Sequence, residues 1–182
     1  MKMKDIYIVL THSGTVLSRI IKFYTKKRYS HVSIALDIDS DKMYSFGRRN
    51  PYNPFFAGFV EESSKEGFFK RFQEAEAMIY TFQVTDEQYE GMKELIEKFA
   101  VNKEQYKFNI LGLFSVAIHK KIQRRNSFYC AEFVKYVIES QEIETNLPEL
   151  IKPEDFTKLK NVKPIYQGKL QDYFRKKQPV FN

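Results

Sequence analysis

The chain contains little of several residue types that mark particular protein classes: one cysteine, seven glycines and six prolines among 182 residues. A single cysteine excludes an internal disulfide and a zinc site built from several cysteines. So few glycines and prolines exclude collagen-like and low-complexity sequence. By contrast, 43% of the residues are hydrophobic and 16% are aromatic, enough to bury a sizeable core. The composition therefore predicts a single folded domain over residues 1–182.

Long hydrophobic runs are also missing. The longest apolar stretch, Ile110 to Ile118, is far shorter than the roughly 20 residues of a membrane-spanning helix. Near the N-terminus, the apolar run from Ile6 to Leu10 is too short for the core of a signal peptide. We therefore expect a cytoplasmic protein without a signal peptide or transmembrane segment.

Positive charge exceeds negative charge, with 30 Lys and Arg against 23 Asp and Glu and a net charge of +7. The cations form two clusters, one of Arg19, Lys22, Lys26, Lys27 and Arg28, the other of Lys120, Lys121, Arg124 and Arg125. Such clusters either are simply solvated or neutralise phosphates and anionic lipid headgroups. No nucleic-acid-binding motif accompanies them, so we expect no specific nucleic acid partner but allow peripheral contact with an anionic membrane surface.

The order of expected elements is mixed. Strands are predicted over residues 5–10, 30–38, 42–47, 77–84 and 162–166, and helices over 16–24, 85–101, 109–123 and 128–140, with a short helix from Pro153. Residues 48–72 are predicted to be a loop, whose Phe55, Phe56, Phe68 and Phe69 would line a groove or pack beneath it. Hairpins beside helices predict an α+β fold with an antiparallel sheet.

Cys130 has the placement that a nucleophilic cysteine requires. It lies on the apolar stripe of the predicted helix, with Phe133, Val134 and Val137 at helical spacing. It also falls in the first turn, where free N–H groups and the helix dipole favour a thiolate and would bind an oxyanion. The alternative is a small apolar residue that fills a helix–sheet contact.

His31 is the best-placed histidine, because it begins a predicted strand. Alternation places His31, Ser33 and Ala35 on one face, where small neighbours leave room for a helix carrying a cysteine. A hydrogen-bonded structural histidine is the alternative. His12 lies in a turn and His119 begins a basic run, so both are less suitable.

A third residue is expected to orient the imidazole. With a hairpin turning near residue 40, the face of His31 includes Ser45, whose hydroxyl can accept a hydrogen bond from the ring. Asp37 has the right parity but lies about 20 Å away along the strand. Because a carboxylate orients more strongly than a hydroxyl, Glu61 and Glu62 remain alternatives.

Three segments resemble a known family: Tyr-Ser-His-Val-Ser-Ile-Ala-Leu-Asp, Met-Tyr-Ser-Phe-Gly-Arg and Phe-Tyr-Cys-Ala-Glu-Phe-Val. They are similar to the circularly permuted papain-like cysteine hydrolases of the YiiX/YaeF type, in the NlpC/P60 superfamily. In that group the histidine strand precedes the cysteine helix, as His31 precedes Cys130. The resemblance implies an antiparallel sheet packed against the cysteine-bearing helix, with Cys130 as nucleophile and His31 as general base. It also implies a third polar residue on the strand after the histidine, where this chain has Ser45 instead of the usual Glu, Gln or His.

Two hypotheses about function result. The first is a cysteine hydrolase or acyltransferase that cleaves an amide or ester of a small molecule, peptide or lipid through a thioester. The second is a non-enzymatic binder of anionic lipid or nucleic acid on the same fold. No cofactor or metal is expected, because the sequence has no phosphate loop and no cluster of metal ligands.

Overall fold

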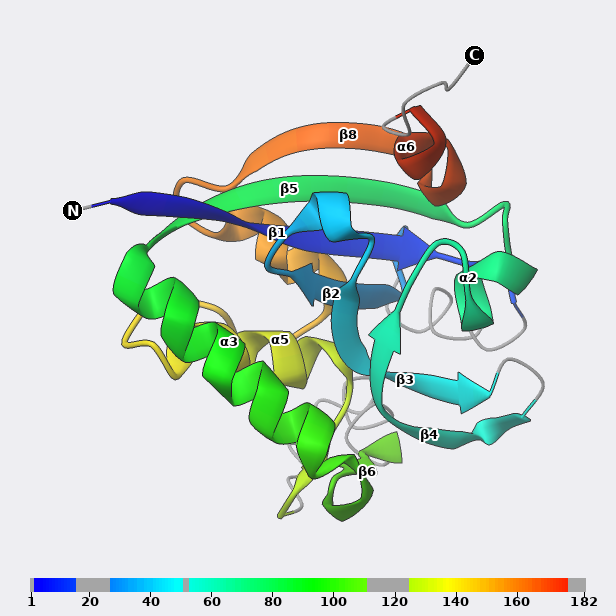
Figure 1. Cartoon of the computed structure of the whole chain (residues 1–182), viewed down its shortest axis with the longest axis horizontal. Helices are drawn as coiled ribbons and strands as arrows, with labels where there is room; N and C mark the ends of the chain where they lie inside the picture. The colour runs from blue at the N-terminus through cyan, green and yellow to red at the C-terminus, as the bar shows by residue number, and fades with distance from the viewer. Residues whose placement is uncertain (1, 16–26, 51–52, 111–124, 177–182) are drawn as a thin grey trace.

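A six-stranded antiparallel sheet forms the centre of the computed structural model, which describes residues 2–15, 27–50, 53–110 and 125–176. The strand order is β4-β3-β2-β1-β5-β8, so β4 and β8 form the two edges (Figure 1). The strands are β1 (Met3–His12), β2 (His31–Ala35), β3 (Met43–Asn50), β4 (Asn53–Glu62), β5 (Glu76–Thr85) and β8 (Lys163–Lys169). A separate parallel pair joins β6 (Lys107–Phe108) to β7 (Ser127–Phe128). The expected α+β architecture with an antiparallel sheet is confirmed.

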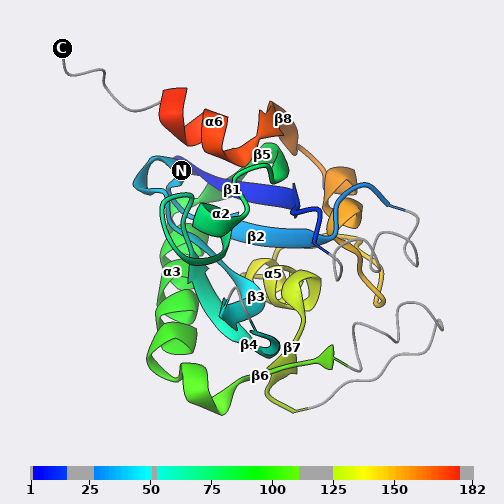
Figure 2. The ribbon, with the colours of Figure 1, turned by 90° about the vertical axis from the view of Figure 1, so that its right-hand side faces the viewer.

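Helices cover both faces of this sheet. The α-helices are α2 (Gly67–Arg71), α3 (Asp86–Val101), α5 (Cys130–Glu139) and α6 (Leu170–Lys176), and the 3-10 helices are η1 (Ile38–Ser40), η2 (Lys103–Gln105) and η3 (Pro153–Lys158). The core shared with α3 and α5 lies on one face, and the core shared with α2 and α6 lies on the other. Figure 2 shows α5 lying against β2 and β3. Among the described residues, no helix combines the length and apolar character that crossing a membrane requires.

The prediction of a loop over residues 48–72 is wrong, because this range contains the end of β3, β4 and α2. Residues 53–62 instead form β4, which pairs with β3 from Asn50↔Asn53 to Met43↔Glu62. Proline is tolerated here because β4 is an edge strand. Pairing with β3 thus prevails over the local turn signals. The helices expected over 16–24 and 109–123 lie, except for residues 109 and 110, outside the described part of the chain.

Alternation along the strands separates two cores. Ile8 of β1 and Val32 and Ile34 of β2 pack with α5 in the larger core, whereas Val9 and Ala35 belong to the core on the opposite face. This is the period of two that a strand buried on both sides produces. The face on which each helix packs therefore follows from the parity of a few β-branched residues.

A reciprocal pair of hydrogen bonds begins α3, as the sequence predicts. Thr85 Oγ1 accepts from the Gln88 N–H at 3.2 Å, and Gln88 Oε1 accepts from the Thr85 N–H at 3.0 Å. Replacing Thr85 with alanine removes one acceptor and is expected to lower the free energy of unfolding by about 1 kcal/mol. Urea unfolding measures this change. Thr85→Ser, which keeps the hydroxyl, serves as the control, and an equal loss in both variants would contradict the capping role.

Candidate active site

A carboxylate holds the imidazole ring of His31 at the start of β2. Nε2 of His31 lies 2.9 Å from Oε1 and 3.1 Å from Oε2 of Glu62, the last residue of β4. The side chain of Glu62 is only 8% exposed and that of His31 is 22% exposed, so solvent screens the pair weakly. A carboxylate at this distance fixes the ring orientation and favours its protonated form.

Two small residues make room for this pair. At Gly47 on β3, a β carbon would lie 3.4 Å from both Glu62 Oε1 and His31 Cε1, so a larger side chain would push into the space that the pair occupies. Ser33 is fully buried, and its Oγ donates a hydrogen bond to Glu62 Oε2 at 2.5 Å. Ser33 Oγ also lies 3.3 Å from His31 Nε2. The carboxylate is therefore held from two sides.

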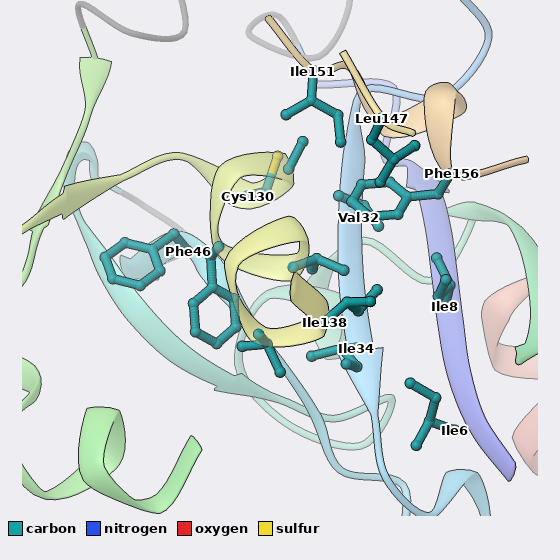
Figure 3. Close-up of a cluster of buried hydrophobic side chains, with 14 of the residues drawn as sticks. Ile6, Ile8, Val32, Ile34, Phe46, Cys130, Ile138, Leu147, Ile151 and Phe156 are labelled. Atoms are coloured by element: carbon teal, nitrogen blue, oxygen red, sulfur yellow. The ribbon is translucent and has the colours of Figure 1, made fainter. Parts of the chain in front are cut away.

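Cys130 is the first residue of α5 and is 4% exposed. The first backbone N–H groups of a helix have no acceptor within the helix, and the dipole there is positive. This end of α5 is anchored: Glu132 Oε2 accepts from the Tyr129 N–H at 3.1 Å, and the Tyr129 hydroxyl donates to the Ile151 carbonyl at 3.0 Å. Figure 3 shows Cys130 at the end of α5, close to Ile151 and to Val32 of β2.

The structure brings His31 and Cys130 together. The two side chains are close enough to interact, because Cys130 contributes to the protonation of the ring. Burial of the ring opposes its positive charge, but the charge of Glu62, the hydrogen bond with Glu62 and the interaction with Cys130 outweigh burial and raise the pKa of His31 to about 10. The ring is therefore protonated near neutral pH, with Cys130 and Glu62 as its partners. Catalytic triads have this arrangement, in which a base lies between a nucleophile and a carboxylate that orients it.

The helix does not cover the face of β2 that the sequence indicated. We expected the cysteine-bearing helix over Ser33 and Ala35, but α5 packs with Val32 and Ile34 on the opposite face. The space beside Ser33 is filled by the carboxylate of Glu62 instead. Cys130 still lies near His31 because each residue begins its element: Cys130 is the first residue of α5, and His31 is the first residue of β2, next to Val32, which belongs to the same core as Cys130.

Ser45 makes a different hydrogen bond from the one expected. It is fully buried, and its Oγ donates to the backbone carbonyl of Val32 at 2.7 Å. The ring nitrogen of His31 is hydrogen-bonded to the carboxylate of Glu62. We therefore replace Ser45 by Glu62 as the residue that orients His31.

The other candidates lie in other surroundings. Glu61, the second carboxylate considered, is half exposed and pairs with Lys42 at 3.1 Å. His12 Nδ1 lies 3.4 Å from Ser30 Oγ at the end of β1. His119 lies outside the described residues.

Of the four phenylalanines expected to line a groove, the three whose side chains are described, Phe56, Phe68 and Phe69, do not gather at Cys130. Phe69 is buried in the core on the other face, with Phe68 packed against that core. Phe56 lines a cavity of about 510 Å³ between β4 and the end of α3. Across this cavity Arg49 Nη1 pairs with Glu104 at 3.0 Å, and none of the lining residues is Cys130, His31 or Glu62. The side chain of Phe55 lies outside the described part of the structure.

The described members of the first basic cluster are paired with carboxylates. Lys27 Nζ lies 3.5 Å from Glu154 and Arg28 Nη2 lies 3.0 Å from Glu76. In the second cluster only Arg125 is described, and the remaining cations of both clusters lie outside the described residues. The paired cations have less charge to offer to a phosphate or a lipid headgroup.

Within residues 2–15, 27–50, 53–110 and 125–176, no group of three or more His, Cys, Asp or Glu side chains is arranged to hold a metal ion. Comparison with models of known protein families and with curated proteins found no match for this chain.

Proposed function

We propose that the protein is a cysteine hydrolase or acyltransferase of the papain-like, circularly permuted type, acting on an amide or ester. The observation that carries this proposal is the position of His31, whose ring is hydrogen-bonded to Glu62 and interacts with Cys130. The order of these residues in the chain, with the histidine strand before the cysteine helix, agrees with the permuted NlpC/P60 pattern.

In the first half of the reaction, the Cys130 thiolate attacks the carbonyl carbon of the substrate and forms a C–S bond. The negative charge that develops on the carbonyl oxygen is stabilised by backbone N–H groups at the start of α5. Protonated His31 gives its proton to the leaving amine or alcohol as the C–N or C–O bond breaks. Glu62 keeps the ring oriented, and a thioester on Cys130 remains.

In the second half, neutral His31 takes a proton from water or from an acceptor alcohol or amine. This nucleophile attacks the thioester carbonyl, and the C–S bond breaks. The acyl group leaves as an acid or as a new ester or amide, and the thiolate and imidazolium are restored. Hydrolase and acyltransferase therefore differ only in the nucleophile that reaches the thioester, and small-molecule, peptide and lipid substrates all fit this chemistry.

Alkylation of the thiol tests the pairing of Cys130 with His31. Because Cys130 is the only cysteine, one iodoacetamide adduct in the intact mass reports on it alone. At about pH 6.5 we expect alkylation to be at least about tenfold slower in His31→Ala, since a thiol without a cationic partner is mostly protonated there. Incubation with p-nitrophenyl acetate should also give an acetyl adduct on Cys130, lost in Cys130→Ala.

His12→Ala is the matched control, because this histidine contacts Ser30 and has no role in the proposed reaction. Its alkylation rate should equal that of the unaltered protein. Equal rates for His31→Ala and the unaltered protein would refute the pairing and with it the proposed function.

A further inference from the structure

The carboxylate of Glu62 has a second buried partner that the proposed reaction does not use. Ser33 is fully buried and donates its hydroxyl proton to Oε2, while Oε1 makes the shorter of the two contacts with His31. Each carboxylate oxygen is thus assigned a partner. A carboxylate held by two donors on two oxygens cannot turn without breaking a charge-assisted hydrogen bond.

We propose that Ser33 is a positioning residue of this site, whose hydroxyl fixes the carboxylate of Glu62 and thereby keeps His31 directed at Cys130. The inference rests on the proposed function for its chemical meaning. Its structural basis is independent of that function, because it consists of one hydrogen bond between two buried side chains.

The bond also bears on charge. Glu62 is buried, and a buried carboxylate that loses a donor becomes costly to keep ionised. The ionisable partners of His31 are Glu62 from β4 and Cys130 from α5. Without the hydroxyl of Ser33, the carboxylate loses one of the hydrogen bonds that fix it and can turn away from the ring, which weakens its hold on the imidazolium.

The chain offers a close control in Ser45. It is as completely buried as Ser33 and lies on the neighbouring strand, but its hydroxyl donates to the backbone of Val32 rather than to the carboxylate. Ser33→Ala and Ser45→Ala each remove one hydroxyl from the interior of the sheet. A merely structural role predicts similar losses of stability for both and no difference in the reactivity of Cys130.

The experiment measures the rate of iodoacetamide alkylation from about pH 5 to 10 in the unaltered protein, Ser33→Ala, Ser33→Thr and Ser45→Ala. In Ser33→Ala we expect the rate near pH 7 to fall about tenfold and the pH profile to move to higher pH, the size expected for losing a hydrogen bond to a charged group. Ser33→Thr keeps the hydroxyl and should recover most of the rate. Ser45→Ala should keep the profile of the unaltered protein.

The outcomes separate the two proposals. If the rate depends on His31 but Ser33→Ala and Ser45→Ala have the same profile, the positioning role is overturned and the proposed function stands. If the rate does not depend on His31, the proposed function fails. NMR titration of the His31 ring then still tests the hydrogen bond, since Ser33→Ala should lower the pKa of His31 and Ser45→Ala should not. Unchanged titration in Ser33→Ala overturns the inference in either case.

Discussion

Replacing Glu62 with glutamine should slow alkylation of Cys130 near neutral pH by about 100-fold, the largest effect expected of any change that leaves the thiol and imidazole in place. The amide has nearly the same shape but no charge. The negative charge of Glu62 is a main reason that the pKa of His31 is raised to about 10, so its loss lowers that pKa toward the ordinary value of 6.5. At pH 8 the ring then loses its proton, and the thiolate loses its cationic partner.

The loss of alkylation rate in Glu62→Gln should depend on pH. The gap between Glu62→Gln and the unaltered protein should be wide at pH 7 and close near pH 10, where an isolated cysteine is itself ionised. NMR titration of the His31 ring gives the pKa directly. Glu61→Gln is the control, because the neighbouring carboxylate is half exposed and pairs with Lys42. A His31 ring that titrates alike in both variants would show that Glu62 does not set its protonation.

Phe46→Ala should lower the free energy of unfolding by about 3–5 kcal/mol, as expected for the loss of a fully buried aromatic ring. Phe46 has no exposed surface, and its ring centroid lies 5.3 Å from those of Phe128 and Phe133. It lies 6.0 Å from those of Phe59 and Phe99. These rings join β3 and β4 to α3 and α5, so the cavity left by alanine would loosen the attachment of the cysteine helix.

Urea unfolding measures this loss, and the same substitution elsewhere supplies the control. Phe56 is 53% exposed, so Phe56→Ala should change the free energy of unfolding by only about 0.5 kcal/mol. Phe46→Leu keeps most of the buried volume and should lose about 1 kcal/mol. A loss in Phe46→Ala no greater than that in Phe56→Ala would mean that this cluster does not hold the fold together.

Local sequence signals predicted the elements whose determinants are themselves local. The strand at β1 and the helix at α3 follow from a β-rich apolar run and from the Thr85–Gln88 cap. Edge strand β4 was missed because its evidence is non-local. It exists through pairing with β3, and its own residues begin with turn signals. The last helix, α6, was also missed, because it is short. Its Leu170 and Phe174 are buried only through packing in the second core, which the sequence of this segment does not reveal.

The residues of the candidate site likewise fall into those that local sequence could predict and those that depend on tertiary pairing. Cys130 and His31 could be selected from their own segments, one at a helix start and one at a strand start. The alternation of side chains correctly placed Ser45 on a strand beside β2, but it does not reveal that the ring nitrogen of His31 is hydrogen-bonded to Glu62 instead. Glu62 could be named only as an alternative, because its approach to His31 depends on β4, which was expected to be a loop. Ser33 appeared only as a small neighbour of the histidine, since its partner was not yet in place.

The strands of the sheet are paired over very different lengths, and the shortest ladder lies next to the candidate site. The ladder between β2 and β3 is confined to Ile34↔Tyr44, whereas β3 and β4 pair along almost their full length. β3 and β4 thus form a ribbon attached to the remaining strands by a narrow seam, with His31 on one side and Glu62 on the other. The salt bridge between them connects the two sides of this seam, so a change in the tilt of the ribbon is expected to change the position of the imidazole. We therefore expect a substitution at Tyr44, whose ring stacks on Phe59 within the ribbon, to alter the contact between Glu62 and His31.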